Sequence, residues 1–466
     1  MTTAELQRLD RQYVWHPFTH MKLWLADDPL VITHGQGVYV IDSDGQRYLD
    51  GTSSLWCNVH GHRVPKIDQA IRDQLDKIAH STLLGLANEM ATVLAERLVK
   101  IAPPGLTKVF YSDSGATATE AAFKMAVQYW WNQGRPEKCE FVGVEEGYHG
   151  DTVGGMSVGR TTAFHKPYWP LLFKTHFTPA PADFRSDKSA DEVAAGALAQ
   201  LRNLLQNNCN RIAAVAVEPL VMGAAGMVVY SPSYLAGVRA LCDEFDVLMI
   251  ADEVATGFGR TGKMFACEHA DITPDFLCLG KGITGGYLPL AATLTTQKIF
   301  DAFLGDPWEA KTFFHGHTYT GNPLAAAAAL ASLDLFEETN LLAHVRLTSQ
   351  IVRRELSALE SLPVVGDVRQ CGFMVGVELV ADRKTAKPFD PKLRVGAALC
   401  QRLRKHGVLV RPLGDTIVIN PPLVTSADEW RLIVNALKEE ILASADTLAS
   451  AAAVAVRGDE QVAGDY

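Results

Sequence analysis

Between about residue 105 and residue 300, short apolar runs alternate with helical patterns, and this alternation restricts the fold more than any other feature of the chain. Helical patterns such as ATEAAFKMAVQYWW and PSYLAGVRALCDEF separate several of the runs. Strands that are apolar on both faces and alternate with helices form a mostly parallel sheet covered on both sides. We therefore predict an α/β fold on such a sheet. The runs are KVFYS (108–112), EFVGV (140–144), RIAAVAVEP (211–219), VLMIADE (247–253), DFLCLGK (275–281) and LAATLTT (290–296).

The two ends of the chain follow other patterns. Near the N-terminus, VYVIDSDG and QRYLD flank an Asp-Gly pair, which is typical of a β-hairpin. Near the C-terminus, FMVGVELV and either VLVRPL or TIVINPP predict the strands of a smaller α+β unit. We predict an N-terminal segment of a small domain (1–60), a large domain (61–330), a C-terminal small domain (331–440) and a flexible tail (441–466).

Composition excludes several classes of function. The 466 residues carry a net charge of −10, whereas a nucleic-acid or anionic-membrane surface needs a basic face. The 8 cysteines include no C-x-x-C pair, so we expect neither a disulfide framework nor a zinc site. The N-terminal residues MTTAELQRLDRQYVWHPF have charges where a secretory signal has its apolar run. We expect a cytoplasmic protein without a nucleic-acid or membrane partner.

Two chemically distinctive residues follow apolar strands of the predicted sheet. Asp252 ends VLMIAD, and Lys281 follows DFLCLG in a glycine-rich turn. Each residue alone is more simply explained as a turn cap or a surface side chain. Ligands of open α/β sheets bind beyond the carboxyl ends of the strands, where both residues would lie. Together they suit a Schiff-base lysine with an aspartate partner for a pyridinium nitrogen.

A third segment tests this interpretation. SDSGAT leads from a strand into a helix, and its small residues would leave backbone N–H groups free at a helix N-terminus, which suits a phosphate. No P-loop motif G-x-x-x-x-G-K-[ST] occurs, and no G-x-G-x-x-G opens a βαβ unit. Beside Asp252 and Lys281, this segment predicts the phosphate seat of pyridoxal 5'-phosphate.

At this point the sequence resembles the class III, fold-type I aminotransferases. The shared blocks include WHPFTHM, DSGATATEAAFKMAVQYW, GYHGDTVG, DEVATGFGRTGKMFACEHADITPD, LGKGITGG and HGHTYTGNPLA. The motifs are most similar to those of the family members that aminate 8-amino-7-oxononanoate to 7,8-diaminononanoate in biotin synthesis. The resemblance implies a seven-stranded sheet in the large domain, bound pyridoxal 5'-phosphate, a ping-pong mechanism and a homodimer with shared active sites.

The family's coenzyme contacts carry over to matching positions. Lys281 in LGKG would bind the coenzyme as a Schiff base, and Asp252 in DEVATGFGR would pair with the ring N–H. Tyr148 in GYHGD would lie against the ring and act as the third catalytic residue. The resemblance assigns the other coenzyme contacts to Gly115, Ala116, His149, His317 and Thr318, of which His317 and Thr318 would come from the other subunit.

Substrate contacts carry over less completely. Arg411 in VLVRPLGD matches the arginine that receives the substrate carboxylate, although on spacing alone it could be a surface arginine. Trp56 matches one of two adjacent pocket tryptophans; Leu55 replaces the other, and Phe18 stands where well-known members carry tyrosine. These two departures leave S-adenosylmethionine and lysine open as the amino donor. Tyr148 and Lys281 also face the substrate, and Gly316 would border it.

Three other interpretations compete with this one. The first is another class III transaminase acting on a terminal amine, such as ornithine, 4-aminobutyrate or another ω-amino acid. The second is a pyridoxal-phosphate-binding protein retained for a regulatory or structural role, which predicts the loss of Lys281 or Asp252, whereas both are present. The third is metal ligation by the two H-G-H motifs, which no carboxylate–histidine set at helical spacing accompanies, so we expect no metal.

Overall fold

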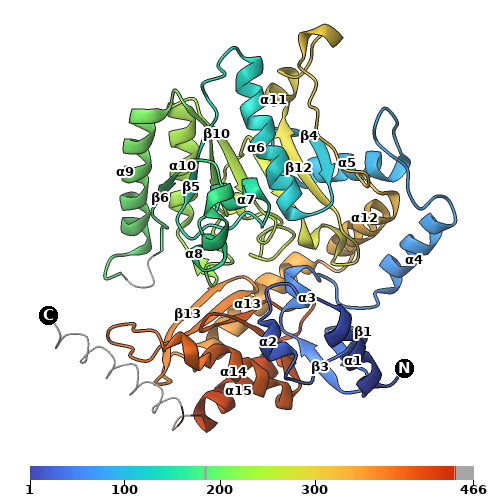
Figure 1. The fold of residues 1–466 in the computed structure, drawn as a ribbon, viewed down its shortest axis with the longest axis vertical. Coiled ribbons are helices and arrows are strands. Elements are labelled where there is room, and N and C mark those ends of the chain that lie inside the picture. The colour runs from blue at the N-terminus through green and yellow to red at the C-terminus, as the bar shows by residue number, and fades with distance from the viewer. Residues whose placement is uncertain (183–185, 445–446, 448–466) are drawn as a thin grey trace.

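The large part of the molecule is built on a seven-stranded sheet (Figure 1). The computed structural model describes residues 1–182, 186–444 and 447. The strand order is β4-β12-β11-β10-β7-β5-β6, and β12 runs antiparallel to both of its neighbours while the other pairs are parallel. The predicted mostly parallel sheet is confirmed. Its strands are β4 (Leu106–Ser112), β5 (Glu140–Val144), β6 (Thr175–Thr178), β7 (Ile212–Val217), β10 (Leu248–Asp252), β11 (Phe276–Leu279) and β12 (Ala291–Thr296).

Helices cover both faces of this sheet because its central strands are apolar on both sides. On β10, Leu248 and Ile250 join the core beneath α6, whereas Met249 and Ala251 join the core on the opposite face. Successive side chains of a strand point to opposite faces of the sheet, so a strand without polar residues must be packed against other elements on both faces. The helices around this sheet are α5 (Glu89–Ile101), α6 (Gly115–Asn132), α9 (Ala190–Asn208), α10 (Pro232–Glu244), α11 (Gln297–Asp301) and α12 (Pro323–Glu338).

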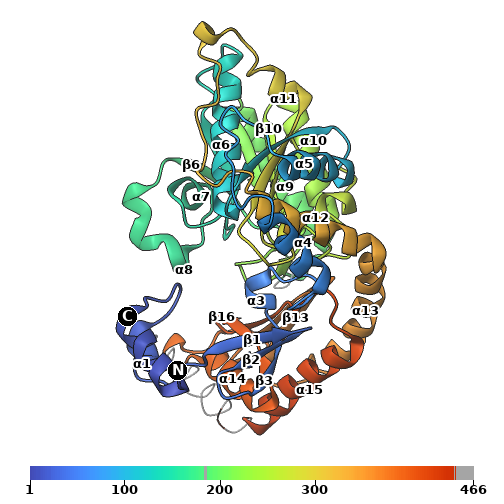
Figure 2. The ribbon, with the colours of Figure 1, turned by 90° about the vertical axis from the view of Figure 1, so that its right-hand side faces the viewer.

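The two ends of the chain meet in a second unit, where N-terminal strands lie beside C-terminal elements (Figure 2). One sheet has the order β1-β2-β3-β15 and the other β13-β14-β17-β16. The run VLVRPL is divided between them, because β15 pairs with β3 and β16 pairs with β17. These strands are β1 (Ile32–Gln36), β2 (Tyr39–Asp42), β3 (Arg47–Asp50), β13 (Val365–Cys371), β14 (Met374–Leu379), β15 (Val408–Leu409), β16 (Arg411–Leu413) and β17 (Thr416–Ile419).

The remaining elements connect and flank these sheets. A small hairpin pairs β8 (Val221–Met222) with β9 (Val228–Val229). None of the helices within the described residues is long and apolar enough to cross a membrane. Most of the predicted tail, including 448–466, lies outside the described residues. The other α-helices are α1 (Thr3–Tyr13), α2 (Met21–Trp24), α3 (Ser53–Trp56), α4 (Pro65–Leu75), α7 (Val153–Val158), α8 (Thr162–His165), α13 (Leu341–Leu356), α14 (Val395–Leu403) and α15 (Ala427–Ala443).

Candidate active site

A cavity of about 390 Å³ lies where the carboxyl ends of β10 and β11 meet the start of α6. Most of the predicted coenzyme contacts lie on its walls, together with three predicted substrate contacts, of which Tyr148 and Lys281 are also coenzyme contacts. The structure therefore brings together residues that are far apart in the sequence. The predicted residues that line the cavity are Trp56, Gly115, Ala116, Tyr148, His149, Asp252 and Lys281.

Asp252 is a buried carboxylate held by a histidine. It is the last residue of β10, and its Oδ2 accepts a hydrogen bond from Nδ1 of His149 at 2.8 Å. Burial opposes protonation of His149, but the bond to Asp252 outweighs it and raises the pKa of the imidazole. The backbone carbonyl of His149 accepts a hydrogen bond from the hydroxyl of Thr119, which holds the main chain at this point. The imidazole therefore fixes the orientation of the Asp252 carboxylate on the cavity wall.

Lys281 enters the cavity from the turn after β11. Burial lowers the pKa of its amine, although the negative charges of Asp252 and Glu218 oppose the shift. A Cβ at the preceding Gly280 would lie 3.3 Å from Cα of Gly115, so the turn packs directly against the start of α6. An amine with a lowered pKa is available in its neutral, nucleophilic form closer to neutral pH.

The start of α6 offers donors for an anion. Ser114 caps this 18-residue helix, and its Oγ accepts from the backbone of Thr117 at 3.3 Å. The first N–H groups of a helix have no partner within it, and the helix dipole makes this end positive. A Cβ at Gly115 would lie 2.4 Å from Cγ1 of Val254, so glycine is required for this close approach.

A second acidic side chain on the cavity wall, Glu218, was not predicted. It follows β7, as Asp252 ends β10, and it accepts backbone hydrogen bonds from Tyr148 and Gly223, both at 3.0 Å. Burial raises its pKa to about 7. The signal that could have found it is its position directly after the apolar run of β7, which resembles the position of Asp252 at the end of β10.

Tyr148 is held by another residue that we did not predict. Its hydroxyl donates to Oδ2 of Asp151 at 2.8 Å, and its ring stacks on His165 with centroids 5.9 Å apart. Burial raises the pKa of Tyr148 well above its ordinary value. Burial would also raise the pKa of Asp151, but the nearby imidazole of His165 and the hydrogen bond from Tyr148 lower it. The tyrosine hydroxyl therefore stays protonated and oriented.

The other predicted residues are not on the cavity wall. Arg411 lies on β16 of the second unit, with its guanidinium carbon 5.9 Å from the ring centroid of Phe18. Leu55 adjoins Trp56 but is exposed. His317 is half-buried, 3.8 Å from Asp113. The remaining two, Gly316 and Thr318, are exposed.

The H-G-H histidines have other partners. His60 is buried against Ser332, with Nε2 3.0 Å from the hydroxyl, and burial lowers its pKa to about 4. His62 pairs with Asp50 at 3.1 Å. In the described part of the chain, no three histidine, cysteine or acidic side chains gather in a way that could hold a metal ion.

Comparison with known proteins agrees with this geometry. The family model described as aminotransferase class-III matches residues 24–441. The chain belongs to the class III aminotransferases. It is 52% identical over 442 residues to an adenosylmethionine-8-amino-7-oxononanoate aminotransferase of Geobacter sulfurreducens, covering 94% of this chain and 98% of that protein.

Solved structures of this family share the fold. The crystal structure of adenosylmethionine-8-amino-7-oxononanoate aminotransferase from Methanocaldococcus jannaschii superposes with a TM-score of 0.90 at 45% identity, covering 94% of this chain and 98% of that one. A pyridoxal-phosphate-bound amine transaminase from an uncultivated Pseudomonas species gives 0.88 at 38% identity, covering 92% and 98%. The predicted family, fold and enzyme class are confirmed.

Proposed function

We propose that this aminotransferase binds pyridoxal 5'-phosphate and transfers an amino group to 8-amino-7-oxononanoate, giving 7,8-diaminononanoate. The observation that carries the proposal is the presence, on one cavity, of the Lys281 amine, the Asp252–His149 pair and the start of α6. These groups match the aldehyde, the ring nitrogen and the phosphate of the coenzyme. A lysine that forms a Schiff base and an acidic partner for the pyridinium nitrogen are the protein groups that pyridoxal phosphate requires.

The residues present fit the coenzyme. Backbone N–H groups of Gly115 and Ala116 would bind the phosphate, because the glycine at the helix start leaves no side chain in the way. Asp252 would hold the ring nitrogen protonated, and His149 would keep the carboxylate oriented toward it. Tyr148 would cover one side of the ring. The chemistry that bound coenzyme supplies is the withdrawal of electrons from the carbon that carries the amine.

Lys281 then has two tasks. Its amine would hold the coenzyme aldehyde covalently until an incoming amine displaces it. Once released, Nζ of Lys281 would accept a proton from the donor carbon and later return one to the acceptor carbon. Burial lowers the pKa of this amine, which favours the neutral form that such a base requires.

We infer that Arg411 recognises the carboxylate of the acceptor. A guanidinium binds a carboxylate through two parallel hydrogen bonds, and the apolar ring of Phe18 lies beside Arg411. The acceptor chemistry is supported by the names of similar proteins, including the Geobacter sulfurreducens enzyme at 52% identity. The alternative, an ω-amino acid transaminase, is supported by structures named omega transaminases, which are 30–33% identical.

The amino donor would be S-adenosylmethionine or lysine. The names of the most similar proteins favour S-adenosylmethionine, whereas the replacements at Phe18 and Leu55 lie on the substrate side and leave lysine open. Mixing coenzyme-loaded enzyme separately with each amine decides this, because only the true donor bleaches the visible absorbance. Subsequent addition of 8-amino-7-oxononanoate should restore that absorbance. Restoration by a different carbonyl acceptor alone would overturn the proposed function.

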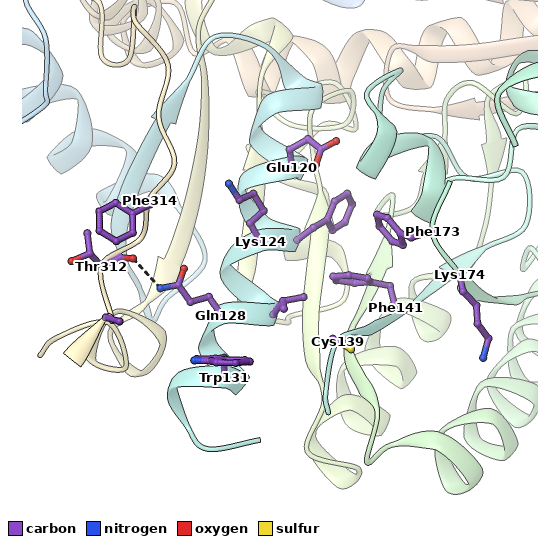
Figure 3. A pocket seen from close by; sticks show the side chains of 13 residues that line it. Glu120, Lys124, Gln128, Trp131, Cys139, Phe141, Phe173, Lys174, Thr312 and Phe314 are labelled. Carbon is purple, nitrogen blue, oxygen red and sulfur yellow. Dashed lines mark hydrogen bonds between the residues drawn. The ribbon is translucent and has the colours of Figure 1, made fainter. Parts of the chain in front are cut away.

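We also propose that a second copy of the chain covers an exposed apolar face. This face surrounds a hollow of about 660 Å³ between α6, β5 and the segment before α12 (Figure 3). Trp131 is 66% exposed and Phe314 is 82% exposed, which is costly for aromatic side chains in an isolated chain. His317 and Thr318 follow Phe314 in the sequence, so a dimer through this face suits their expected role in the partner's site. Trp131→Asp should convert the dimer to a monomer in sedimentation; an unchanged mass would contradict this.

A further inference from the structure

The segment Ser53–Trp56, labelled α3, turns in the left-handed sense. Its four φ angles are 45°, 51°, 78° and 67°. The backbone N–H of Trp56 donates to the carbonyl of Thr52 at 2.7 Å, and that of Cys57 donates to Ser53 at 3.1 Å, as in one turn of a helix. L-residues other than glycine disfavour this hand, and they enter it mostly as single residues. Such a run persists only where neighbouring groups hold it.

The first group that holds the turn is the carboxylate of Asp50. Its Oδ1 accepts from the backbone N–H of Ser54 at 3.0 Å and from the hydroxyl of Thr52 at 3.2 Å. Its Oδ2 accepts from the Ser54 hydroxyl at 2.8 Å and from His62 at 3.1 Å. Asp50 is only 3% exposed. One buried carboxylate thus receives donors from within the turn and from the chain beyond it.

The second group is the guanidinium of Arg260, which is also buried. It donates to the hydroxyl of Ser53 at 2.9 Å and to the carbonyl of Asn58 at 2.8 Å. Its other nitrogen donates to Oδ1 of Asn420 at 2.8 Å. Arg260 therefore ties both ends of the turn to the end of β17.

The turn determines where Trp56 lies. The Trp56 ring forms part of the cavity wall, with Nζ of Lys281 5.4 Å from its centroid. On its other side, a Cβ at Gly223 would lie 3.0 Å from Cζ3 of Trp56, so the indole fills the available space. A right-handed or extended backbone at Trp56 would direct the side chain elsewhere.

We propose that Asp50 is a positioning residue: together with Arg260 it holds the left-handed turn that places Trp56 against Lys281, and it thereby sets the affinity for the acceptor substrate. The left-handed turn is seen directly in the backbone angles, and the side chains of Asp50 and Arg260 contact it. The part that concerns the acceptor rests on the proposed function. Asp50 itself does not line the cavity.

The first test measures the hand of the turn in the apoenzyme. Leu55 is 50% exposed with a φ of 78°, so Leu55→Gly should be more stable than Leu55→Ala, by about fivefold in the unfolding equilibrium. The matched control is Leu347, an exposed leucine inside α13, where alanine should be more stable than glycine. If alanine is the more stable residue at both positions, the turn is not left-handed and the proposal fails.

The second test asks whether Asp50 acts through Trp56. Asp50→Ala and Trp56→Ala should each raise KM for 8-amino-7-oxononanoate by about 10- to 100-fold, and the double variant should be no worse than either alone. Affinity for the coenzyme, measured by its absorbance on titration, should change little. Additive losses in the double variant, or coenzyme loss in Asp50→Ala alone, would overturn the proposal.

Two further arms keep the test decisive. If Asp50→Ala does not fold, Asp50→Asn retains one acceptor oxygen for the backbone of Ser54 and should show a smaller rise in KM in the same direction. If Asp50→Asn and Asp50→Ala both fold and neither changes KM for 8-amino-7-oxononanoate, the proposal is contradicted. Failure of the proposed function would appear differently, as wild-type enzyme that does not turn over 8-amino-7-oxononanoate, and it would leave the glycine–alanine order at Leu55 unchanged.

Discussion

The coenzyme side and the substrate side of the site are built differently. On the coenzyme side, Asp252, Lys281 and Glu218 follow three strands of one sheet and are fixed by buried hydrogen bonds or close packing. On the substrate side, Phe18 and Arg411 come from opposite ends of the chain and belong to another unit. The proposed reactive groups are thus placed by the core, whereas the proposed recognition groups are placed by peripheral segments. Substitutions on the two sides should therefore have different kinetic signatures.

The largest effect is expected at the covalent residue on the coenzyme side. Lys281→Ala removes both the nucleophile and the base, so turnover should fall by at least about 10⁴-fold and the visible absorbance should be lost. Both half-reactions should fail together. Lys405→Ala, at an exposed lysine of the second unit, is the control and should retain full activity. Wild-type turnover by Lys281→Ala would remove the distinction between the two sides.

The next effect is expected at the charge partner of the ring nitrogen. Asp252→Asn keeps the shape of the side chain but loses its charge, so each half-reaction should slow by about 10²- to 10³-fold. The loss should be equal for donor and acceptor, because both half-reactions use the same electron withdrawal. Stopped-flow absorbance measures each rate separately. A loss confined to one substrate would place Asp252 on the recognition side.

On the proposed substrate side, a substitution of Arg411 should affect one substrate much more than the other. Arg411→Ala removes a charged hydrogen-bond donor, so KM for 8-amino-7-oxononanoate should rise by about 30- to 100-fold, while KM for the donor changes by less than about twofold. Arg411→Lys keeps the charge without the bidentate geometry, so its KM for 8-amino-7-oxononanoate should lie between those of the wild type and Arg411→Ala. Steady-state kinetics with each substrate varied in turn measures the split. Equal increases for both substrates would exclude a specific carboxylate site.

The smallest effect concerns the pH dependence of stability at Glu218. Burial raises its pKa to about 7 from 4.5, so the folded protein binds a proton that the unfolded chain releases in this window. The stability contributed by this group is therefore present at low pH and is lost as the pH rises toward 7. In the apoenzyme, Glu218→Gln should reduce the decline between pH 5 and pH 7 by up to about 2 kcal/mol.

The charged groups around Glu218 also affect its pKa, and with it the direction of the pH dependence. The charge of His149 lowers its pKa and the charge of Asp252 raises it, and the amine of Lys281 lies nearby. His149→Gln is the companion variant, because it leaves Glu218 in place without the neutralising imidazole. Urea unfolding at several pH values measures both variants. A steeper decline in Glu218→Gln than in the wild type would contradict the raised pKa.

The sequence predicted the sheet well because strands buried on both faces need continuous apolar runs, and β5 coincides with its predicted run. It did not predict β6, because this edge strand, THFT, has only one apolar residue and therefore no apolar run. The runs VLVRPL and TIVINPP were predicted as alternatives for a strand, but both contain strands, and the residues of VLVRPL pair with strands of two different sheets. Pairing partners depend on contacts that no local pattern contains.

The site shows the same limit. Asp252 and Lys281 were predicted because they follow apolar strands and have distinctive chemistry. Asp151 was missed because a carboxylate in a loop gives no sign of the tyrosine that it holds. The left-handed turn at Ser53–Trp56 was missed because it contains no glycine, which is the usual sign of positive φ. Such features are imposed by tertiary contacts and become visible only in the folded chain.

The central claim is that the side chain of Lys281 carries the coenzyme at this cavity. Borohydride reduction of the coenzyme-loaded enzyme, followed by peptide mass mapping, tests it most directly because reduction makes the linkage permanent. We predict a single modified peptide, with the coenzyme on Lys281. Modification of a different lysine, such as Lys124 on the exposed face of α6, with an unmodified Lys281 would contradict the claim.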